Sequence, residues 1–315
     1  MWRGARWLTA VSGLLIAGVY AGAQAQDTAP PVVGRWDLTV GTDAGSYPSW
    51  LEVQRSGNHV LVGRFVGRTG SARPVASVEF ADDVMRFSIP PQWEPGDRDL
   101  HVEGRVDGEG LSGWLTDPAG TRLTWTARRA PSLRRPAPSS WGTPIALFDG
   151  SGMAAWQASE NSQWRVVDGI LSSPKPGRNL VSRQTFTDFK LHAEFRYPRG
   201  GNSGIYLRGR YEAQIEDSAG LDPGSEHLGG IYGFLPPNEN AAKRAGEWQT
   251  YDITLIGRLV TIVLNGRTVI AGQEIPGITG GALDSDEGAP GPIFLQGDHT
   301  AIDYRNIVLT PARRD

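Results

Sequence analysis

Cysteine is absent from this chain of 315 residues, and methionine occurs only three times. The lack of cysteine excludes structural disulfides, thiolate metal sites and lipid attachment to an N-terminal cysteine. Neither sign of charge dominates, because the formal net charge is only −3. Nothing in the charge balance therefore indicates binding to nucleic acid or to an anionic membrane surface.

Turn-forming and aromatic residues are abundant instead. The chain contains 41 glycines, 22 prolines and 11 tryptophans, a composition typical of many short strands joined by turns. The length allows two domains, each with its own core. We therefore predict an all-β protein with a small N-terminal barrel-like domain followed by a larger β-sandwich.

The first 25 residues have the features of a secretory leader. Arg3 and Arg6 form a positive start, residues 8–19 are apolar, and Ala23-Gln24-Ala25 offers small residues at a cleavage site. The apolar stretch is short and rich in glycine for a membrane-spanning helix. We expect a secreted or periplasmic protein that has no membrane anchor once the leader is removed.

Residues 33–129 are predicted to form the small β domain. Short alternating segments follow one another with turn residues between them, and no window has a sustained helical period. The opening Gly34-Arg35-Trp36 and the closing stretch 125–128 are similar to the first and last strands of lipocalin-like barrels. Such a barrel either binds a ligand or is filled by its own side chains, and we favour a filled structural module.

A proline-rich linker, residues 130–140, separates this domain from a second β domain over residues 141–311. The linker is poor in apolar anchors, so we expect the domains to unfold separately and a chain beginning at Trp141 to fold and keep most of its activity. Asp168-Gly169 and Asn265-Gly266 mark hairpin turns. A dozen or so antiparallel strands in this length predict a two-sheet sandwich of jelly-roll type with a concave face.

The segment 200–218, GGNSGIYLRGRYEAQIEDS, predicts two strands with one apolar and one polar face. A three-residue turn that pairs Arg208 with Glu212 would align the apolar faces of the two strands. Arg208, Glu212 and Gln214 would then form a polar cluster suited to a ligand rich in hydroxyl and carbonyl groups. The alternative is a solvated sheet face with a cross-strand ion pair.

Nine segments in this order resemble the 3-keto-disaccharide hydrolase domain family, which has a concanavalin-like jelly-roll fold. They are ALFDG, WRVVDGIL, DFKLHAEFR, GGNSGIYLRG, YEAQIED, GGIYG, NAAKRAGEWQTYDITLIG, LNGRTVI and GPIFLQGDHTAIDYRNI. The resemblance covers nearly all of residues 143–311, and it fits members that carry a small β domain before the catalytic one.

The resemblance implies chemistry on glycosides whose C3 hydroxyl is already a ketone. The ketone acidifies the proton on C2, so a base can form an enolate that expels the aglycone from C1, and water then adds back. Such a site needs a base, donors to the enolate oxygen and an acid for the leaving oxygen. The implied substrate is an oxidised glycoside or disaccharide, supplied by a sugar 3-dehydrogenase that acts earlier.

His299 and Glu212 are the candidate catalytic residues, and either could be the base. Tyr232 is a wall or proton donor, Asp217 orients Arg208 or binds a cation, and Glu247 braces the site. The candidate substrate-binding residues are Asn202, Arg208, Gln214, Asp217, Tyr232, Lys243, Glu247 and Gln296.

Two other functions remain open. A laminarinase-type glycosidase would need a carboxylate where this chain has Gln214, and a lectin-like protein would bind sugar without turnover. A divalent cation held by Glu212, Asp217, Asp298 and His299 also stays open, although the sequence has no dense ligand spacing.

Overall fold

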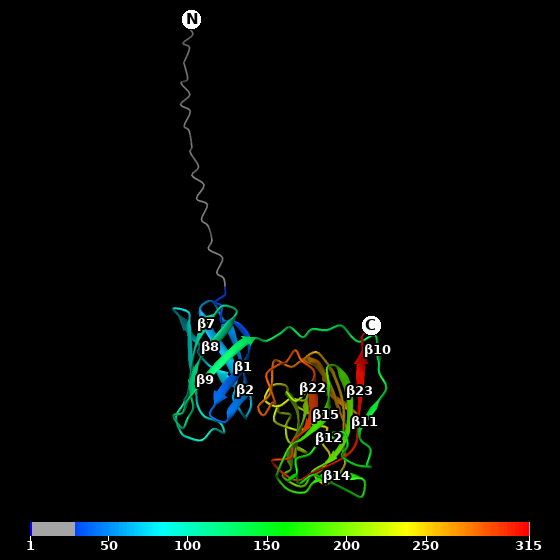
Figure 1. Cartoon of the computed structure of the whole chain (residues 1–315). Coiled ribbons are helices and arrows are strands. Elements are labelled where there is room, and N and C mark those ends of the chain that lie inside the picture. Colours follow the sequence, from blue (N-terminus) through cyan, green and yellow to red (C-terminus); the bar gives the residue numbers. More distant parts are fainter. Residues whose placement is uncertain (2–28, 315) are drawn as a thin grey trace.

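The computed structural model describes residue 1 and residues 29–314, so the expected leader lies, apart from its first residue, outside the described part (Figure 1). All regular elements in the described residues are β-strands, as predicted. These residues contain no helix with the length and apolar character needed to cross a lipid bilayer.

The first nine strands form one curled antiparallel sheet, here called the N-terminal domain. Its spatial order is β4-β3-β2-β1-β9-β8-β7-β6-β5, and β4 also contacts β6, so that the sheet curls toward closure. Trp36 and Trp125 fill its interior, at 1% and 2% exposure. The strands are β1 (Gly34–Thr42), β2 (Gly45–Ser56), β3 (Val60–Val66), β4 (Arg73–Val75), β5 (Glu79–Ala81), β6 (Val84–Ile89), β7 (Leu100–Asp107), β8 (Gly110–Thr116) and β9 (Arg122–Arg129).

The remaining strands, here called the C-terminal domain, form two sheets that enclose one large apolar core, as in a jelly-roll sandwich. The larger sheet contains β10 (Ser140–Trp141), β11 (Ile145–Phe148), β13 (Arg165–Val167), β14 (Ile170–Ser173), β16 (Phe189–Arg196), β19 (Gln249–Ile256), β20 (Leu259–Leu264), β21 (Arg267–Glu274) and β23 (Ile302–Arg313). The smaller sheet has the order β12 (Trp156–Gln157), β15 (Leu180–Phe186), β22 (Gly291–Leu295), β17 (Asn202–Leu207) and β18 (Tyr211–Glu216).

The predicted faces of β17 and β18 are correct, but the predicted register is wrong. Glu212 pairs with Tyr206 rather than with Arg208, because Arg208 belongs to the turn. Its φ of 54° places it in the left-handed region that closes the hairpin. The two strands keep their apolar side chains on the sandwich core, and Tyr206, Glu212 and Gln214 share the opposite face.

The linker is extended, but it is anchored on the C-terminal domain. Leu133 is buried, and the Arg135 guanidinium lies 3.0 Å from the Asp188 carboxylate. Pro131 offers its carbonyl to Arg258 at 2.9 Å. The predicted lack of anchoring contacts is therefore wrong.

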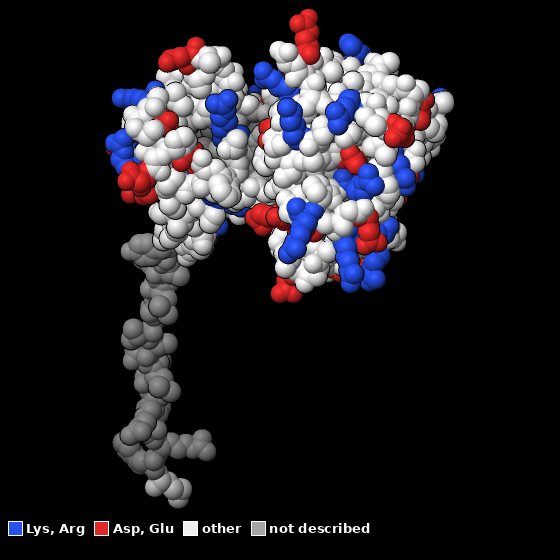
Figure 2. Space-filling model, turned by 90° about the horizontal axis from the view of Figure 1, so that it is seen from below, with Lys and Arg blue, Asp and Glu red and all other residues white. Residues whose placement is uncertain are grey.

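The two domains also share a packed interface. Trp50 and Val66 of the N-terminal domain belong to the apolar core of the C-terminal domain, and Trp50 meets Phe234 edge-on with ring centroids 5.3 Å apart. A Cβ atom on Gly277 would lie 2.2 Å from the Trp50 ring, so only glycine permits this approach. The expectation of two domains joined by little apolar surface is wrong. Figure 2 shows both lobes in contact, with charges of both signs scattered over the visible face.

Asp37 on β1 is a buried carboxyl group at this interface. It is 2% exposed, and neither carboxyl oxygen has a hydrogen-bond partner among the described residues. Burial and, to a smaller extent, the nearby Glu287 carboxylate together raise the pKa of Asp37 to about 8. The native protein therefore holds a proton that the unfolded chain releases near pH 3.8, so this group's contribution to stability falls as pH rises from about 4 to about 8.

We expect Asp37→Asn to be close to neutral near pH 4 and increasingly stabilising as pH rises. Its free energy of unfolding, relative to that of the wild type, should gain more than about 1 kcal/mol between pH 5 and 8, because each pKa unit corresponds to about 1.4 kcal/mol. Urea denaturation across that range measures this. Asp286→Asn is the matched control at the same interface, since Asp286 is exposed and pairs with exposed Arg128. An equal pH trend in both variants contradicts the prediction.

Candidate active site

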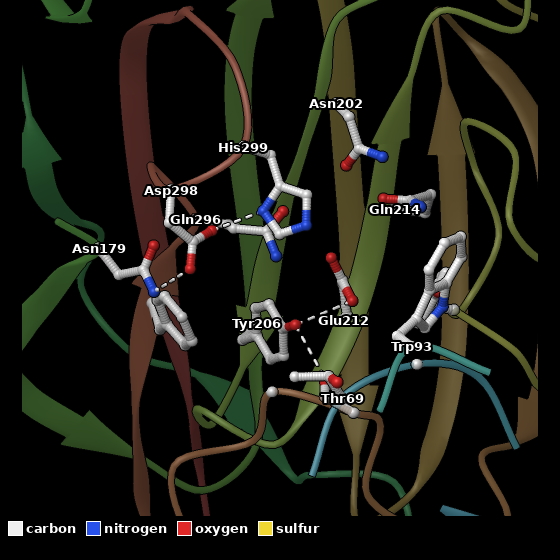
Figure 3. Close-up of a pocket in the computed structure, with 15 residues that line it drawn as sticks. Thr69, Trp93, Asn179, Asn202, Tyr206, Glu212, Gln214, Gln296, Asp298 and His299 are labelled. Carbon is white, nitrogen blue, oxygen red and sulfur yellow. Dashed lines mark hydrogen bonds and ion pairs between the residues drawn. The ribbon is translucent and has the colours of Figure 1, made fainter. Parts of the chain in front are cut away.

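A pocket of about 470 Å³ lies over the smaller sheet, where the two domains meet (Figure 3). This volume is in the usual range for small-molecule sites. It is lined by Thr69, Gly70, Trp93, Asn179, Asn202, Tyr206, Glu212, Gln214, Tyr232, Gly280, Gly281, Phe294, Gln296, Asp298 and His299.

Two stacked aromatic rings support the pocket. Tyr206 on β17 pairs with Phe294 on β22, and their ring centroids are 4.4 Å apart at an interplanar angle of 18°. Gly204, two residues earlier, leaves room for the carboxyl group of Glu212, because a Cβ there would lie 2.3 Å from Glu212 Oε1. The sheet thus provides a rigid base with space for one carboxyl group.

Glu212, on β18, is only 4% exposed. Its carboxyl group contacts the Tyr206 hydroxyl, which also contacts a backbone carbonyl. The Tyr206 hydroxyl lies 2.9 Å from Glu212 Oε2 and 2.8 Å from the carbonyl oxygen of Gly280. A hydroxyl has a single hydrogen, so both contacts are hydrogen bonds at once only if Glu212 is protonated and donates to Tyr206. The geometry therefore suits a neutral carboxylic acid.

The electrostatic environment of Glu212 favours the same protonation state. Burial raises its pKa to about 8, and the Tyr206 hydrogen bond and the charge of His299 only partly oppose this rise. Near neutral pH the side chain can therefore give a proton to a ligand.

His299 and Asp298 form a second proton-handling pair in the same pocket. His299 Nδ1 lies 2.6 Å from Asp298 Oδ1 and donates a hydrogen bond to it, so that in the neutral imidazole Nε2 is the acceptor. This hydrogen bond raises the pKa of His299 above its usual 6.5. Burial opposes ionisation of Asp298, but hydrogen bonds from His299 and Asn179 outweigh it and lower the pKa of Asp298.

Amide side chains supply further polar contacts. Gln296 is 8% exposed, and its buried Oε1 has no hydrogen-bond partner among the described residues. Gln214 Oε1 accepts from the backbone N–H of Ile215 at 3.0 Å, and Asn202 extends from β17 toward the pocket (Figure 3). A buried amide atom without a hydrogen-bond partner destabilises the fold, unless a bound ligand supplies the missing hydrogen bond.

Tyr232 lies beside β18, because its backbone N–H donates to the Glu212 carbonyl at 3.0 Å. Burial raises the pKa of Tyr232, while a hydrogen bond with the Trp93 side chain lowers it. Tyr232 therefore forms a wall that joins the sheet to the N-terminal domain.

Six of the ten predicted site residues line this pocket: Asn202, Glu212, Gln214, Tyr232, Gln296 and His299. Arg208 does not line it. Its fully buried guanidinium donates to the carbonyls of Glu287 and Gly257 and to the Tyr211 hydroxyl. A turn position with positive φ directs this side chain into the protein interior, where it braces the core.

Three other predicted residues also lie outside the pocket lining. Asp217 accepts from the backbone N–H of Gly200 at 2.9 Å, and so it joins the segment after β18 to the segment before β17. Lys243 Nζ donates to the Trp248 carbonyl, and Glu247 accepts from the N–H of Arg244. The last two side chains stabilise the exposed loop that carries them.

Sequence reasoning missed several lining residues. Tyr206 alternated visibly with the apolar residues of β17, so its position on the polar face was a usable signal. Asn179, Thr69, Gly70 and Trp93 come from distant segments. Nothing in their local sequence indicated this site.

The described residues contain no group of three or more His, Cys, Asp or Glu side chains arranged to hold a metal ion. Glu212, Asp298 and His299 share the pocket, but Asp217 does not line it with them. The four-residue cation site considered from the sequence is therefore not assembled in this arrangement.

Comparison with known proteins places the C-terminal domain among glycoside-cleaving proteins. The sequence profile of the 3-keto-α-glucoside-1,2-lyase-like domain matches residues 143–310, and the chain belongs to this family. This confirms the family that the nine segments indicated. No curated protein matches the chain.

Several solved structures are similar to this chain. A candidate glycosyl hydrolase from Parabacteroides distasonis is 28% identical, covers 56% of this chain and 92% of its own, and has a TM-score of 0.45. A second one from the same organism is 24% identical, with coverages of 55% and 100% and a TM-score of 0.43. A carbohydrate-binding module from Bacillus subtilis is 13% identical, with coverages of 55% and 98% and a TM-score of 0.31.

Proposed function

We propose that this protein cleaves 3-keto-glycosides by removing the C2 proton and eliminating the aglycone from C1. The observation that carries the proposal is the pairing of a buried, neutral Glu212 with a His299 oriented by Asp298 in one pocket. One group is suited to give a proton and the other to accept one.

The roles follow from these environments. His299 Nε2 takes the C2 proton, and the electrons of that C–H bond form the enolate of the C3 ketone. The enolate collapses to a C1=C2 double bond as the C1–O bond breaks, and Glu212 protonates the departing oxygen. Water then adds across the double bond, so that the net reaction is hydrolysis.

Gln296, Gln214 and Asn202 are the proposed donors to the ketone, the enolate oxygen and the sugar hydroxyls. Donors aimed at an oxygen that gains charge in the transition state lower the barrier most. In Gln296 the Nε2 group is the donor for this role, while its buried Oε1, which has no internal partner, can accept from a sugar hydroxyl.

A conventional glycosidase fits these residues less well. Its mechanism needs two carboxyl groups that face the scissile bond, but Asp298 is engaged by His299 and Asn179. The laminarinase pattern also fails, since an amide occupies position 214 and Asp217 lies outside the pocket lining. A sugar-binding protein without turnover remains the alternative that the experiment must separate.

The test compares a 3-keto-glucoside with its unoxidised parent. We expect cleavage of the keto-sugar and no cleavage of the parent, because only the ketone makes the C2 proton acidic enough for histidine. In heavy water, the released 3-keto-glucose should contain deuterium at C2. Cleavage of the parent at a similar rate would indicate a glycosidase, and binding of both sugars without turnover would indicate a lectin.

The proposal includes the setting in which the substrate arises. The leader-like first 25 residues support an exported protein. A sugar 3-dehydrogenase is the class of enzyme that would supply the ketone, since nothing in the proposed mechanism oxidises C3.

A further inference from the structure

One wall of the pocket comes from the N-terminal domain, outside the family's characteristic region. Thr69, Gly70 and Trp93 line it, whereas the family domain spans residues 143–310. The pocket is therefore incomplete without the N-terminal domain.

Trp93 is unusual among the tryptophans of this domain. Trp36, Trp50 and Trp125 are almost fully buried, but Trp93 is 69% exposed in the loop between β6 and β7. An indole ring at such a position contributes little to a core, and its apolar face is available for stacking.

The loop that carries Trp93 is held firmly by a buried arginine. Arg73, which is 8% exposed, donates to the Pro90 carbonyl at 2.9 Å and to Glu94 Oε1 at 2.6 Å. Glu94 Oε2 in turn accepts from the backbone N–H groups of Gln92 and Trp93, at 2.9 and 3.2 Å. The ring is thus presented on a braced loop.

A second brace joins this loop to the segment before β4. Gln92 Nε2 donates to Ser71 Oγ at 2.8 Å, and the Ser71 N–H donates to Gln92 Oε1 at 3.1 Å. Pre-ordering of this kind reduces the entropy lost when a ligand binds.

The same part of the N-terminal domain contacts the segment that holds the acid. A Cβ atom on Gly280 would lie 2.3 Å from the Gly70 carbonyl oxygen, so the two backbones are in close contact. The Gly280 carbonyl also accepts the Tyr206 hydroxyl, which contacts Glu212. This links the position of Trp93 to the catalytic groups.

Exposure differs strongly around the pocket, and also between the two proposed catalytic groups, because the His299 side chain is 51% exposed. Glu212 and Gln296 are 4% and 8% exposed, whereas Trp93 is 69% exposed. In Figure 3, Glu212 lies between the His299–Asp298 pair and Trp93. A keto-sugar whose C2 faces His299 and whose C1 oxygen faces Glu212 therefore directs its leaving group past Glu212 toward Trp93.

We propose that Trp93 is the platform of an aglycone subsite that selects substrates whose leaving group is a ring, either a second sugar or an aryl group. The inference rests on the proposed function, because it defines the subsite by the bond that is cleaved. The ring stacks on the indole, and Tyr232 borders the same subsite. A leaving group as small as methanol cannot reach the indole.

The test measures kcat and KM for three 3-keto-α-glucosides, whose aglycones are glucose, 4-nitrophenol and methanol. We expect Trp93→Ala to lower kcat/KM about tenfold for the two ring aglycones, mainly through KM, and less than twofold for the methyl glycoside. Trp93→Phe should recover part of the loss. Trp114→Ala is the matched control, because Trp114 is a partly buried tryptophan of the same domain and does not line the pocket. It should change neither parameter.

Equal losses for all three substrates would overturn the subsite, since they would indicate a general structural effect. The loss for only one of the two ring aglycones would show which leaving group the indole accepts. If the wild type cleaves none of them, the proposed function fails. Calorimetric binding of the unoxidised glucosides then still tests whether Trp93 is a platform for ring-shaped groups. The wild type must then bind 4-nitrophenyl α-glucoside or the disaccharide more tightly than methyl α-glucoside, and Trp93→Ala must remove that preference. If the wild type binds all three glucosides equally well, the role of Trp93 as a platform is overturned.

Discussion

Replacing Glu212 with glutamine is expected to lower kcat/KM for a 3-keto-glycoside by about two to four orders of magnitude. Glutamine has the shape of the protonated side chain and can still donate to the Tyr206 hydroxyl, but it has no proton to transfer. The fold should therefore remain intact while protonation of the leaving oxygen is lost. Steady-state kinetics and a thermal melt of the same preparation measure both effects.

The distinct roles of Glu212 and His299 can be separated by isotope exchange. In heavy water, Glu212→Gln should still exchange the C2 proton of the intact keto-glycoside, because His299 remains. His299→Ala should lose both exchange and cleavage. If Glu212→Gln abolishes exchange and His299→Ala retains it, then Glu212 is the base and the assignment of roles is reversed.

The pH dependence of kcat/KM gives a second signature. Activity should rise as His299 loses its proton above pH 6.5 and fall as Glu212 loses its proton near pH 8, which gives a bell-shaped profile. Glu212→Gln should remove the alkaline limb from the remaining activity. Glu216→Gln is the matched control, since Glu216 lies on the same strand outside the pocket lining and should preserve the limb. An alkaline limb that persists in Glu212→Gln contradicts the assignment.

Removing the N-terminal domain is expected to have the other large effect. A chain that begins at Trp141 should lose at least about 100-fold in activity and melt at a lower temperature, because Trp50 and Val66 leave the shared core. Burying a large aromatic side chain typically contributes about 3–5 kcal/mol, judged from truncation to alanine. The full chain should consequently unfold in one transition by both fluorescence and circular dichroism.

A separately produced fragment of residues 29–139 provides the complementary measurement. Mixed in excess with the shortened chain, it should restore part of the activity, because it restores the contacts between Trp50 and Phe234 and between Gly70 and Gly280. A shortened chain with full activity and an unchanged melting temperature would refute this account of the interface.

Much of the fold could be predicted from local signals. Alternation in β17 and β18 correctly separated the core face from the polar face, and the Asn265-Gly266 turn joins β20 and β21. The register could not be obtained in this way, because several three-residue turns were compatible with the same alternation. The positive φ of Arg208 selects one of them, and this arginine has contacts with Glu287 and Gly257 that only the folded chain brings together.

The site was predictable where its residues share the small sheet or follow its strands, as Glu212, Gln214 and Gln296 do. It was not predictable where contacts depend on how two domains dock. Lys243 and Glu247 looked available for a ligand, yet their hydrogen bonds are satisfied within one loop. Trp93 had no distinguishing sequence signal, because its position over the pocket arises only from the interface.

The glycine at position 280 has a consequence for how this enzyme class could diversify. It touches the N-terminal domain on one side and receives the Tyr206 hydroxyl on the other. On the proposed roles, reaction chemistry and leaving-group preference are encoded in separate stretches of the gene, and the Gly280 peptide is one of the places where the two stretches meet. We therefore expect that exchange of the first stretch between relatives, with this contact preserved, alters which leaving groups are accepted and leaves the proposed elimination unchanged.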